Sequence, residues 1–187
     1  MKFFVTGVNG QLGHDVMNEL VKRGHLGIGS DIADNYSRVS DGSAICSASY
    51  VSLDIIDKEA VQNIIEEIKP DAVIHCAAWT AVDMAEDDDK VELVRKVNAG
   101  GTQNIADACK TIDAKMLYLS TDYVFDGQGT KPWTPDCKEY KPLNVYGQTK
   151  LEGELAVSST LDKYFIVRIA WCARLGSWAT VRTSSRP

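Results

Sequence analysis

The chain has 187 residues, which is enough for one domain with a sizeable buried core and too few for two full domains. Its content of 44% hydrophobic and 25% charged residues is typical of a globular protein and argues against a disordered or fibrous one. A formal net charge of -6 provides no broad positive field for phosphate groups, so no nucleic-acid partner is expected.

Targeting and redox signals are also weak. No stretch approaches the roughly 18 uninterrupted apolar residues of a membrane span, and the first residues reach Gly7 too soon for a signal peptide. An odd number of cysteines without a CxxC pair argues against a disulfide framework and a zinc site. We therefore expect a cytoplasmic protein with reduced thiols and no membrane association. The cysteines are Cys46, Cys76, Cys109, Cys137 and Cys172.

The first elements follow the order strand, glycine turn, helix. The apolar run 3–5 predicts a strand, and the turn 7–13 leads into a helix that ends at Gly24. A second strand, 26–30, ends in Asp31, and the polar stretch 33–49 reads as a long irregular loop. The apolar face of this first helix is predicted to comprise Val16, Met17, Leu20 and Val21.

Strands and helices continue to alternate along the rest of the chain. Asp57 is a plausible N-cap for the helix that follows the third strand. This order predicts an α/β protein of the Rossmann type, with a doubly wound parallel sheet and right-handed crossovers. The predicted strands are 50–53, 72–76, 115–120 and 164–169, the helices are 58–68, 90–111 and 146–157, and a loop spans 126–142.

The glycine turn is the strongest cofactor signal. Gly7, Gly10 and Gly13 lie at the first strand-to-helix junction, where backbone amides and the helix N-terminus can approach a pyrophosphate. Asp31 follows near the interval of about 20 residues at which an acid meets the adenosine ribose. It could equally be a solvated loop acid. Its charge would favour NAD over NADP unless Arg38 compensates, so NADPH and NADH both remain open.

Tyr146 and Lys150 form a YxxxK pair, whose side chains share one face of a helix. A lysine ammonium beside the phenol would lower the tyrosine pKa from about 10, so that Tyr146 could protonate a carbonyl oxygen. Ser120 and Thr121 end a strand and would bring hydroxyls to the same sheet edge. A surface tyrosine and lysine without a catalytic role is the alternative interpretation.

The acids from Asp83 to Asp89 are interpreted as a solvated helix start, and no metal site is expected. His14, His25 and His75 have no suitably spaced partner for metal binding or catalysis. Cys76 lacks an adjacent base and is not expected to be a nucleophile.

Several short strings in the sequence carry a family resemblance. They are TGVNGQLG from Thr6, CAAWTAVD from Cys76, the pair Asn98-Ala99, STDYVFDG from Ser120 and PLNVYGQTKLEGE from Pro142. Together they resemble the extended short-chain dehydrogenase/reductase superfamily and, within it, the dTDP-4-dehydrorhamnose reductase family. The similarity runs from Met1 to about Trp171.

The resemblance implies an NADPH- or NADH-dependent oxidoreductase that reduces the C4 keto group of dTDP-4-dehydro-L-rhamnose to dTDP-L-rhamnose. Thr121 would polarise the keto oxygen, Tyr146 would be the acid, and Lys150 would hold the nicotinamide ribose. The implied cofactor-binding residues are Gly7, Gly10, Gln11, Leu12, Gly13, Asp31, Asp54, Ala77, Ala78, Thr80, Tyr146 and Lys150, and the implied substrate-binding residues are Thr80, Val82, Asp83 and Tyr123.

Two other functions stay open. A related sugar-nucleotide epimerase or dehydratase would hold NAD tightly and consume none. A dinucleotide-binding partner resembling the regulatory subunit of methionine adenosyltransferase would not turn over substrate. A homodimer is also possible.

The resemblance fails in two places. The stretch 32–49 is longer than the connection usual in the family and adjoins the adenine side. Residues 172–187 show no periodicity, contain arginines and no acids, and resemble nothing in the family. We therefore expect a cofactor-binding domain over 1–171 and a tail over 172–187 that is disordered or foreign to the family. With the C-terminal substrate lobe largely missing, cofactor binding with poor turnover is expected.

Overall fold

The computed structural model describes residues 1–36, 48–128 and 130–170, which contain a six-stranded parallel sheet. The strand order is β3-β2-β1-β4-β5-β6, and every neighbouring pair is parallel. The predicted Rossmann-type doubly wound sheet is confirmed. The strands are β1 (Lys2–Thr6), β2 (Leu26–Asp31), β3 (Ser49–Ser52), β4 (Ala72–His75), β5 (Lys115–Thr121) and β6 (Tyr164–Ile169). Arg38 and the predicted tail 172–187 lie outside the described residues.

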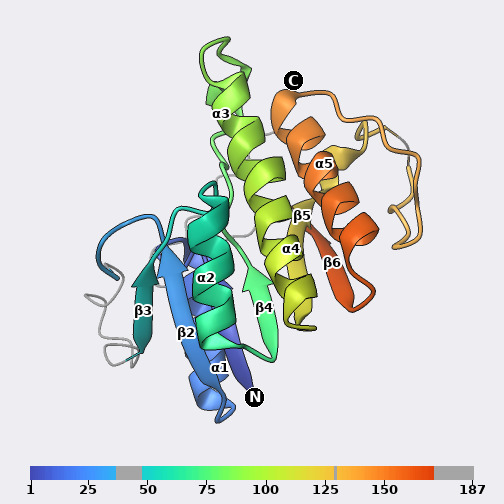
Figure 1. The fold of residues 1–187 in the computed structure, drawn as a ribbon. Coiled ribbons are helices and arrows are strands. Elements are labelled where there is room, and N and C mark those ends of the chain that lie inside the picture. The colour runs from blue at the N-terminus through green and yellow to red at the C-terminus, as the bar shows by residue number, and fades with distance from the viewer. Residues whose placement is uncertain (37–47, 129, 171–187) are drawn as a thin grey trace, which may run out of the picture.

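Helices cover both faces of the sheet. Figure 1 shows α2, α4 and α5 in front of the strands and α1 behind them. The helices are α1 (Gln11–Lys22), α2 (Lys58–Ile68), α3 (Val91–Arg95), α4 (Thr102–Thr111) and α5 (Val145–Thr160), and the short segments are η2 (Asp83–Glu86), η3 (Lys96–Gly101) and η4 (Asp122–Val124).

Two apolar clusters hold these layers together. The larger one packs side chains of α2, α4 and α5 against one face of the sheet, including the fully buried Phe4, Ile65, Ile105 and Tyr118. The smaller one packs Met17 of α1 against the other face. Because β1 lies between β2 and β4, the chain order reverses at this point of the sheet, and a crevice opens beyond the strand ends.

Local signals set the helix boundaries well. α2 begins as predicted, with the Asp57 carboxylate accepting a hydrogen bond from the Ala60 amide at 3.0 Å. α1 differs from the prediction on one side, because Val21 is 47% exposed and the buried positions are Gly13, His14, Met17 and Leu20. The sheet contacts only a narrow stripe of α1, and Val21 lies beyond that stripe.

The helix predicted over 90–111 is interrupted. Its segments α3, η3 and α4 follow one another along a single rod in Figure 1, but η3 is a π-helix. Gly100 and Gly101 lie in this wider turn, where helix propensity is weakest. Such turns occur often at functional sites.

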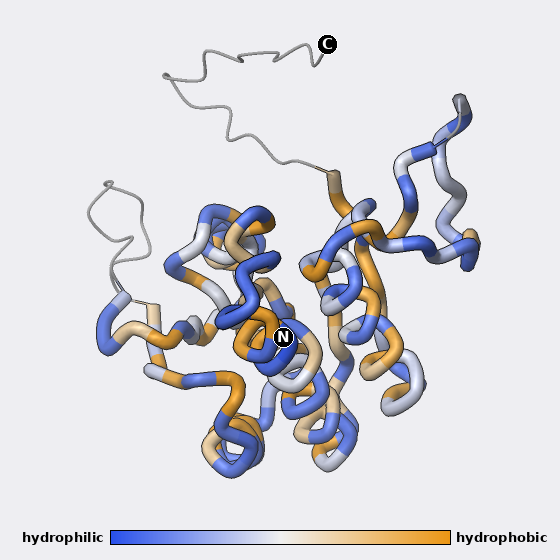
Figure 2. The backbone as a smooth tube through the Cα atoms, turned by 90° about the horizontal axis from the view of Figure 1, so that it is seen from above, coloured by the Kyte–Doolittle hydropathy of each residue, from blue (hydrophilic) through white to orange (hydrophobic). Residues whose placement is uncertain are grey.

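Hydrophilic and hydrophobic residues are interspersed along the helices in Figure 2, as expected for helices with one packed face and one solvated face. Within residues 1–36, 48–128 and 130–170, no helix is both long and apolar enough to span a bilayer.

Candidate functional site

A cavity of about 940 Å³ opens at the carboxyl edge of the sheet, on both sides of the β1/β4 reversal. The glycine turn forms one wall, and the ends of β5 and β6 together with the start of α5 form the opposite wall. The topology thus brings segments that are far apart in sequence to one place. The predicted site residues that line this cavity are Gly7, Gly10, Gln11, Leu12, Gly13, Asp31, Asp54, Ala77, Ala78, Thr80, Val82, Thr121, Tyr123, Tyr146 and Lys150.

The glycine turn leaves no room for side chains. Gly7 has φ of +74°, and a Cβ there would lie 2.6 Å from the Ala77 amide nitrogen. At Gly13 a Cβ would lie 2.2 Å from the Gly7 carbonyl oxygen. No side chain caps the N-terminus of α1, so its first amides face the cavity side without such a partner. This arrangement suits a pyrophosphate, whose charge the amides and helix dipole favour.

Two carboxylates in the cavity wall, those of Asp31 and Asp54, are fixed by backbone amides. Asp31 accepts hydrogen bonds from the Asn9 amide at 2.9 Å and the Ile32 amide at 2.8 Å. Asp54 accepts one from the Ile56 amide at 3.0 Å. Asp31 is thus part of the cavity wall rather than a freely solvated loop acid.

The loop 76–80 is held by a residue to which the sequence analysis assigned no role. Asn98 lies in the π-helical segment η3, where its side-chain oxygen accepts a hydrogen bond from the Trp79 amide at 2.8 Å. Its amide nitrogen donates to the Thr149 hydroxyl at 3.1 Å. Asn98 therefore joins the loop to α5. An asparagine on the apolar face of the helix predicted over 90–111 was the signal that could have revealed it, because a packed side-chain amide needs hydrogen-bond partners.

Tyr146 begins α5 next to the end of β5. Asn144 caps this helix by accepting a hydrogen bond from the Gly147 amide at 2.7 Å. Burial raises the pKa of Tyr146, while a hydrogen bond with the Thr121 side chain opposes that rise. Thr121 and Tyr146 are thus brought together as a pair of hydroxyls at the cavity wall.

Lys150 is buried and has different partners from those expected. Its Nζ donates to the Leu119 carbonyl at 2.6 Å and lies 4.1 Å from the centroid of the Tyr118 ring. Burial lowers the pKa of Lys150 to about 7, and the nearby Glu154 carboxylate opposes this. The expected lowering of the Tyr146 pKa by Lys150 is not found, because the ammonium is directed to the β5 backbone.

The predicted substrate residues are only partly together. Thr80, Val82 and Tyr123 line the cavity, whereas Asp83, at the start of η2, does not belong to the lining. Tyr123 is 43% exposed and its ring contacts that of Tyr146 edge-on at 5.8 Å, so it is not a core residue.

Two hydroxyls in the cavity wall support the presence of a polar ligand. Ser30 at the end of β2 and Ser120 at the end of β5 are buried, and neither hydroxyl finds a hydrogen-bond partner among the described residues. Buried polar groups are normally paired, since leaving them unpaired costs free energy. Together with the uncapped α1 and the close glycine packing, these hydroxyls fit a dinucleotide.

His75 and Cys76, for which no catalytic role is expected, are buried in uncharged forms. His75 is buried between the Thr6 and Thr102 hydroxyls, at 2.7 and 3.1 Å, and burial lowers its pKa to about 3. Burial raises the pKa of Cys76 to about 12, which disfavours a thiolate nucleophile.

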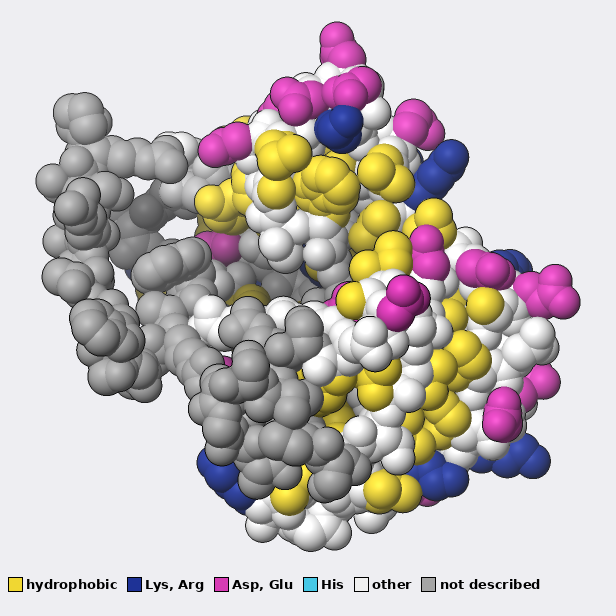
Figure 3. All heavy atoms as spheres, turned by 90° about the vertical axis from the view of Figure 1, so that its left-hand side faces the viewer, with side chains coloured by type: hydrophobic (Ala, Val, Ile, Leu, Met, Phe, Trp, Pro, Cys, Tyr) yellow, Lys and Arg dark blue, Asp and Glu magenta, His cyan; other side chains and the backbone are white. Residues whose placement is uncertain are grey.

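The acidic stretch lies apart from the cavity lining. Acidic side chains gather at the top of the molecule in Figure 3, at the end where η2 and α3 begin. No cluster of potential metal ligands was found among the residues that the structure describes.

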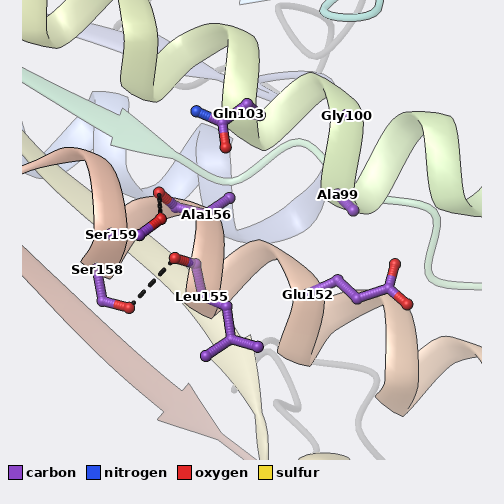
Figure 4. A pocket seen from close by; sticks show the side chains of 8 residues that line it. All are labelled: Ala99, Gly100, Gln103, Glu152, Leu155, Ala156, Ser158 and Ser159. Atoms are coloured by element: carbon purple, nitrogen blue, oxygen red, sulfur yellow. Dashed lines mark hydrogen bonds between the residues drawn. The ribbon is translucent and has the colours of Figure 1, made fainter.

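A second, open depression lies on the outer side of α5, between this helix and η3 with the start of α4. Figure 4 shows Glu152 and Leu155 projecting from α5 beside small residues of both helices. Glu152 forms an ion pair with Arg95 at 3.0 Å. The residues that line this depression are Ala99, Gly100, Gln103, Glu152, Leu155, Ala156, Ser158 and Ser159.

Comparison of the sequence with known proteins matches the chain to one family model and to curated reductases. Residues 1–176 match the family model described as the RmlD substrate binding domain. A dTDP-4-dehydrorhamnose reductase from Streptomyces griseus is 38% identical over 171 residues, covering 91% of this chain and 49% of the relative. The chain therefore spans about half the length of the curated relatives it matches.

Solved structures agree with the sequence comparison. A dTDP-4-dehydrorhamnose reductase from Clostridium acetobutylicum superposes with a TM-score of 0.79 at 39% identity, covering 94% of this chain and 55% of the other. The enzyme from Bacillus anthracis, in complex with NADP, gives a TM-score of 0.74 at 34% identity, covering 91% and 53%.

Proposed function

Because the chain belongs to the RmlD substrate binding domain family, we propose that it is the cofactor-binding part of a dTDP-4-dehydrorhamnose reductase. The reaction is reduction of the C4 keto group of dTDP-4-dehydro-L-rhamnose to give dTDP-L-rhamnose. The observation that carries this proposal is the meeting of the glycine turn, Thr121, Tyr146 and Lys150 around one cavity. The reductases among the relatives favour this function over an epimerase, a dehydratase or a regulatory subunit.

The cofactor is NADPH or NADH, bound along the cavity from the glycine turn to Lys150. Asp31 lies at the adenosine ribose, where its charge favours NADH. The amides at the start of α1 bind the pyrophosphate, and the ammonium of Lys150 binds the nicotinamide ribose. The proposed cofactor-binding set is Gly7, Gly10, Gln11, Leu12, Gly13, Asp31, Asp54, Ala77, Ala78, Thr80, Tyr146 and Lys150.

The cofactor supplies a hydride when bound, and this chain supplies the proton. The Thr121 hydroxyl donates a hydrogen bond to the keto oxygen of the sugar. Tyr146 then gives its phenolic proton to that oxygen as negative charge develops on it. Burial raises the pKa of Tyr146, so the phenol is protonated and ready to act as the acid at neutral pH. Thr80, Val82 and Tyr123, which line the cavity, contact the sugar nucleotide.

The proposal extends to the setting in which the protein works. Free thiols at Cys76, Cys109 and Cys137 support a reducing compartment such as the cytoplasm. Residues 1–171 form the cofactor-binding domain, and the protein associates as a homodimer.

Calorimetric titration with NADH and with NADPH tests cofactor binding. We expect Gly13→Val to abolish binding of both, because its side chain would collide with the Gly7 carbonyl that shapes the turn. Gly100→Ala is the matched control, since Gly100 lies outside the lining of the cavity, has no positive φ, and a Cβ there meets nothing within 4 Å. Unchanged binding by the Gly13 variant would refute the cofactor site.

Turnover tests the chemistry separately. In a version of the chain extended by a family-type C-terminal lobe, oxidation of NADH or NADPH with dTDP-4-dehydro-L-rhamnose should fall by roughly 100-fold or more in Tyr146→Phe, since general-acid catalysis contributes about that much. Cofactor affinity should remain close to that of the unaltered chain, because the phenyl ring keeps the wall intact. A Tyr146→Phe protein as active as its parent would exclude the acid role.

A further inference from the structure

One helical turn beyond Lys150, α5 carries a second buried charged side chain. Lys150 and Glu154 are 3% and 2% exposed, and residues four apart share one face of a helix. Burying a carboxylate costs free energy unless it is paired and hydrogen-bonded. The hydrogen-bond partners of Glu154 therefore decide whether its buried carboxylate stays charged.

Arg168 on β6 pairs with Glu154 through two parallel hydrogen bonds. Its Nε donates to Oε1 at 2.8 Å and its Nη2 donates to Oε2 at 2.7 Å. This bidentate geometry fixes both the position and the orientation of the carboxylate. The pair joins the last described strand to the helix that carries Tyr146 and Lys150.

The guanidinium is itself fixed by the segment between η4 and α5. Arg168 donates to the Tyr140 hydroxyl at 2.9 Å and to the carbonyls of Pro135 and Cys137 at 3.4 Å each. It also lies 5.2 Å from the centroid of the Phe125 ring. Arg168 is thus held from three sides, and it holds Glu154 in turn.

The other groups around Lys150 supply no comparable negative charge. On β4, His75 is neutral because burial lowers its pKa to about 3, and Cys76 is a thiol because burial raises its pKa to about 12. On β5, burial raises the pKa of Tyr118, so its ring faces the ammonium as a neutral phenol. The titratable and charged side chains that face Lys150 or these neighbours from the packed elements are His75, Cys76, Tyr118, Tyr146, Glu154 and Arg168.

We propose that Glu154, fixed by Arg168, is a positioning residue that keeps the Lys150 ammonium charged in the buried wall of the cofactor site. Burial of Lys150 disfavours the charged form that a ribose hydroxyl needs as a donor. The carboxylate one turn away offsets this penalty. Arg168 holds the carboxylate in place through its two hydrogen bonds. The inference rests on the proposed role of Lys150 in cofactor binding.

The titration of Lys150 in the cofactor-free chain tests the proposal. The ¹³Cε signals of labelled lysines can be followed against pH, with the Lys150 signal assigned from its loss in Lys150→Arg. In Glu154→Gln the midpoint of Lys150 should fall by about one pH unit or more, the size expected when a close opposite charge is removed. As the pH rises, Lys150 should lose its proton earlier in Glu154→Gln, so NADH affinity should be lost at a lower pH than in the unaltered chain.

Glu152→Gln is the matched control. It removes a carboxylate from the same helix, also paired with an arginine, but Glu152 faces the outer depression of Figure 4. The Lys150 midpoint should stay unchanged in this variant. An equal shift in Glu152→Gln, or none in Glu154→Gln, would overturn the proposal.

Arg168→Lys provides a second variant that isolates the fixing role of Arg168. It keeps the positive charge beside Glu154 but loses the bidentate fork, so the carboxylate is no longer held in place and the Lys150 midpoint should fall, by less than in Glu154→Gln. This variant decides the matter if Glu154→Gln does not fold, and a midpoint that is unchanged or higher would contradict the proposal. Because the titration uses neither cofactor nor substrate, its failure is distinguishable from failure of the proposed reductase function.

Discussion

His75 illustrates how a titratable residue inside the sheet can have a structural role. Its ring nitrogens contact the hydroxyls of Thr6 on β1 and Thr102 on α4, so it links the sheet to the helix layer. Burial, aided by the charge of Lys150, lowers its pKa from 6.5 to about 3. The folded state therefore holds His75 neutral at pH values where the unfolded chain binds a proton.

This difference makes the fold sensitive to acid. Between pH 6.5 and about 3 the unfolded state binds the extra proton, so the free energy of unfolding decreases as the pH falls. The loss is about 1.4 kcal/mol per pH unit for one proton. Urea denaturation at pH 7, 6 and 5 should show this decrease in the free energy of unfolding. In His75→Gln the decrease per pH unit should be smaller by the contribution of one proton. Equal slopes in both proteins would argue against a neutral buried His75.

The site also shows which residue properties depend on distant partners. The YxxxK spacing predicted correctly that Tyr146 and Lys150 belong to one helix and one cavity. It did not predict that the Lys150 ammonium donates to the Leu119 carbonyl of β5. Helical spacing sets the face on which a side chain lies, whereas its hydrogen-bond partner comes from another part of the chain.

At the scale of elements, close packing depends on glycines in the helices. A Cβ at Gly153 of α5 would lie 2.3 Å from the Tyr118 hydroxyl and 2.9 Å from the Asn98 carbonyl oxygen. α5 can therefore approach η3 and β5 only because this position lacks a side chain. Gly100 in η3 is exposed, and a Cβ there meets nothing within 4 Å.

The two glycines should respond oppositely to alanine. Gly153→Ala should lower the free energy of unfolding by about 1–3 kcal/mol, because the backbone oxygen of Asn98 cannot yield without moving η3. Gly100→Ala should raise it by about 0.5–1 kcal/mol through helix propensity. Chemical denaturation measures both values, and a loss of stability in the Gly100 variant would contradict the packing argument.

The interrupted helix shows the limit of periodicity for elements. The apolar pattern over 90–111 predicted the helix and its packed face, but not the π-helical turn of η3. That turn places Asn98 where it bonds to both the Trp79 backbone and Thr149. The pattern is a property of neighbours in the chain, whereas these bonds join the helix to a loop and to another helix.

At the scale of the molecule, one apolar surface stands out on the edge strand β6. Phe165 and Val167 alternate along the strand and are 64% and 39% exposed. Parallel sheets are usually covered on both faces. Figure 1 shows β6 at the edge of the sheet, with α5 in front of it. Such a surface favours association between molecules.

Replacing Phe165 by Ser should therefore weaken self-association. Sedimentation velocity over a range of concentrations should show a smaller rise of the average sedimentation coefficient in Phe165→Ser than in the unaltered chain. Leu143→Ser is the control, because Leu143 is also highly exposed but lies in the segment before α5. Equal effects of the two replacements would show that exposed area alone, and not the β6 surface, governs association.

The sequence by itself determined the order of strands and helices, the glycine turn at the first junction, the Asp57 cap of α2 and the family. These features depend on short patterns, in which each residue constrains its near neighbours through periodicity, backbone conformation or capping. The fold class followed because few topologies accommodate alternating strands and helices.

Only the tertiary structure decided which side chains meet. The partners of Lys150, the bonds of Asn98 and the pairing of Glu154 with Arg168 join residues from different elements. The exposure of Val21 likewise depends on how much of α1 the sheet can contact. Such contacts and the resulting pKa shifts arise from burial and from charges that approach in space, which no local pattern encodes.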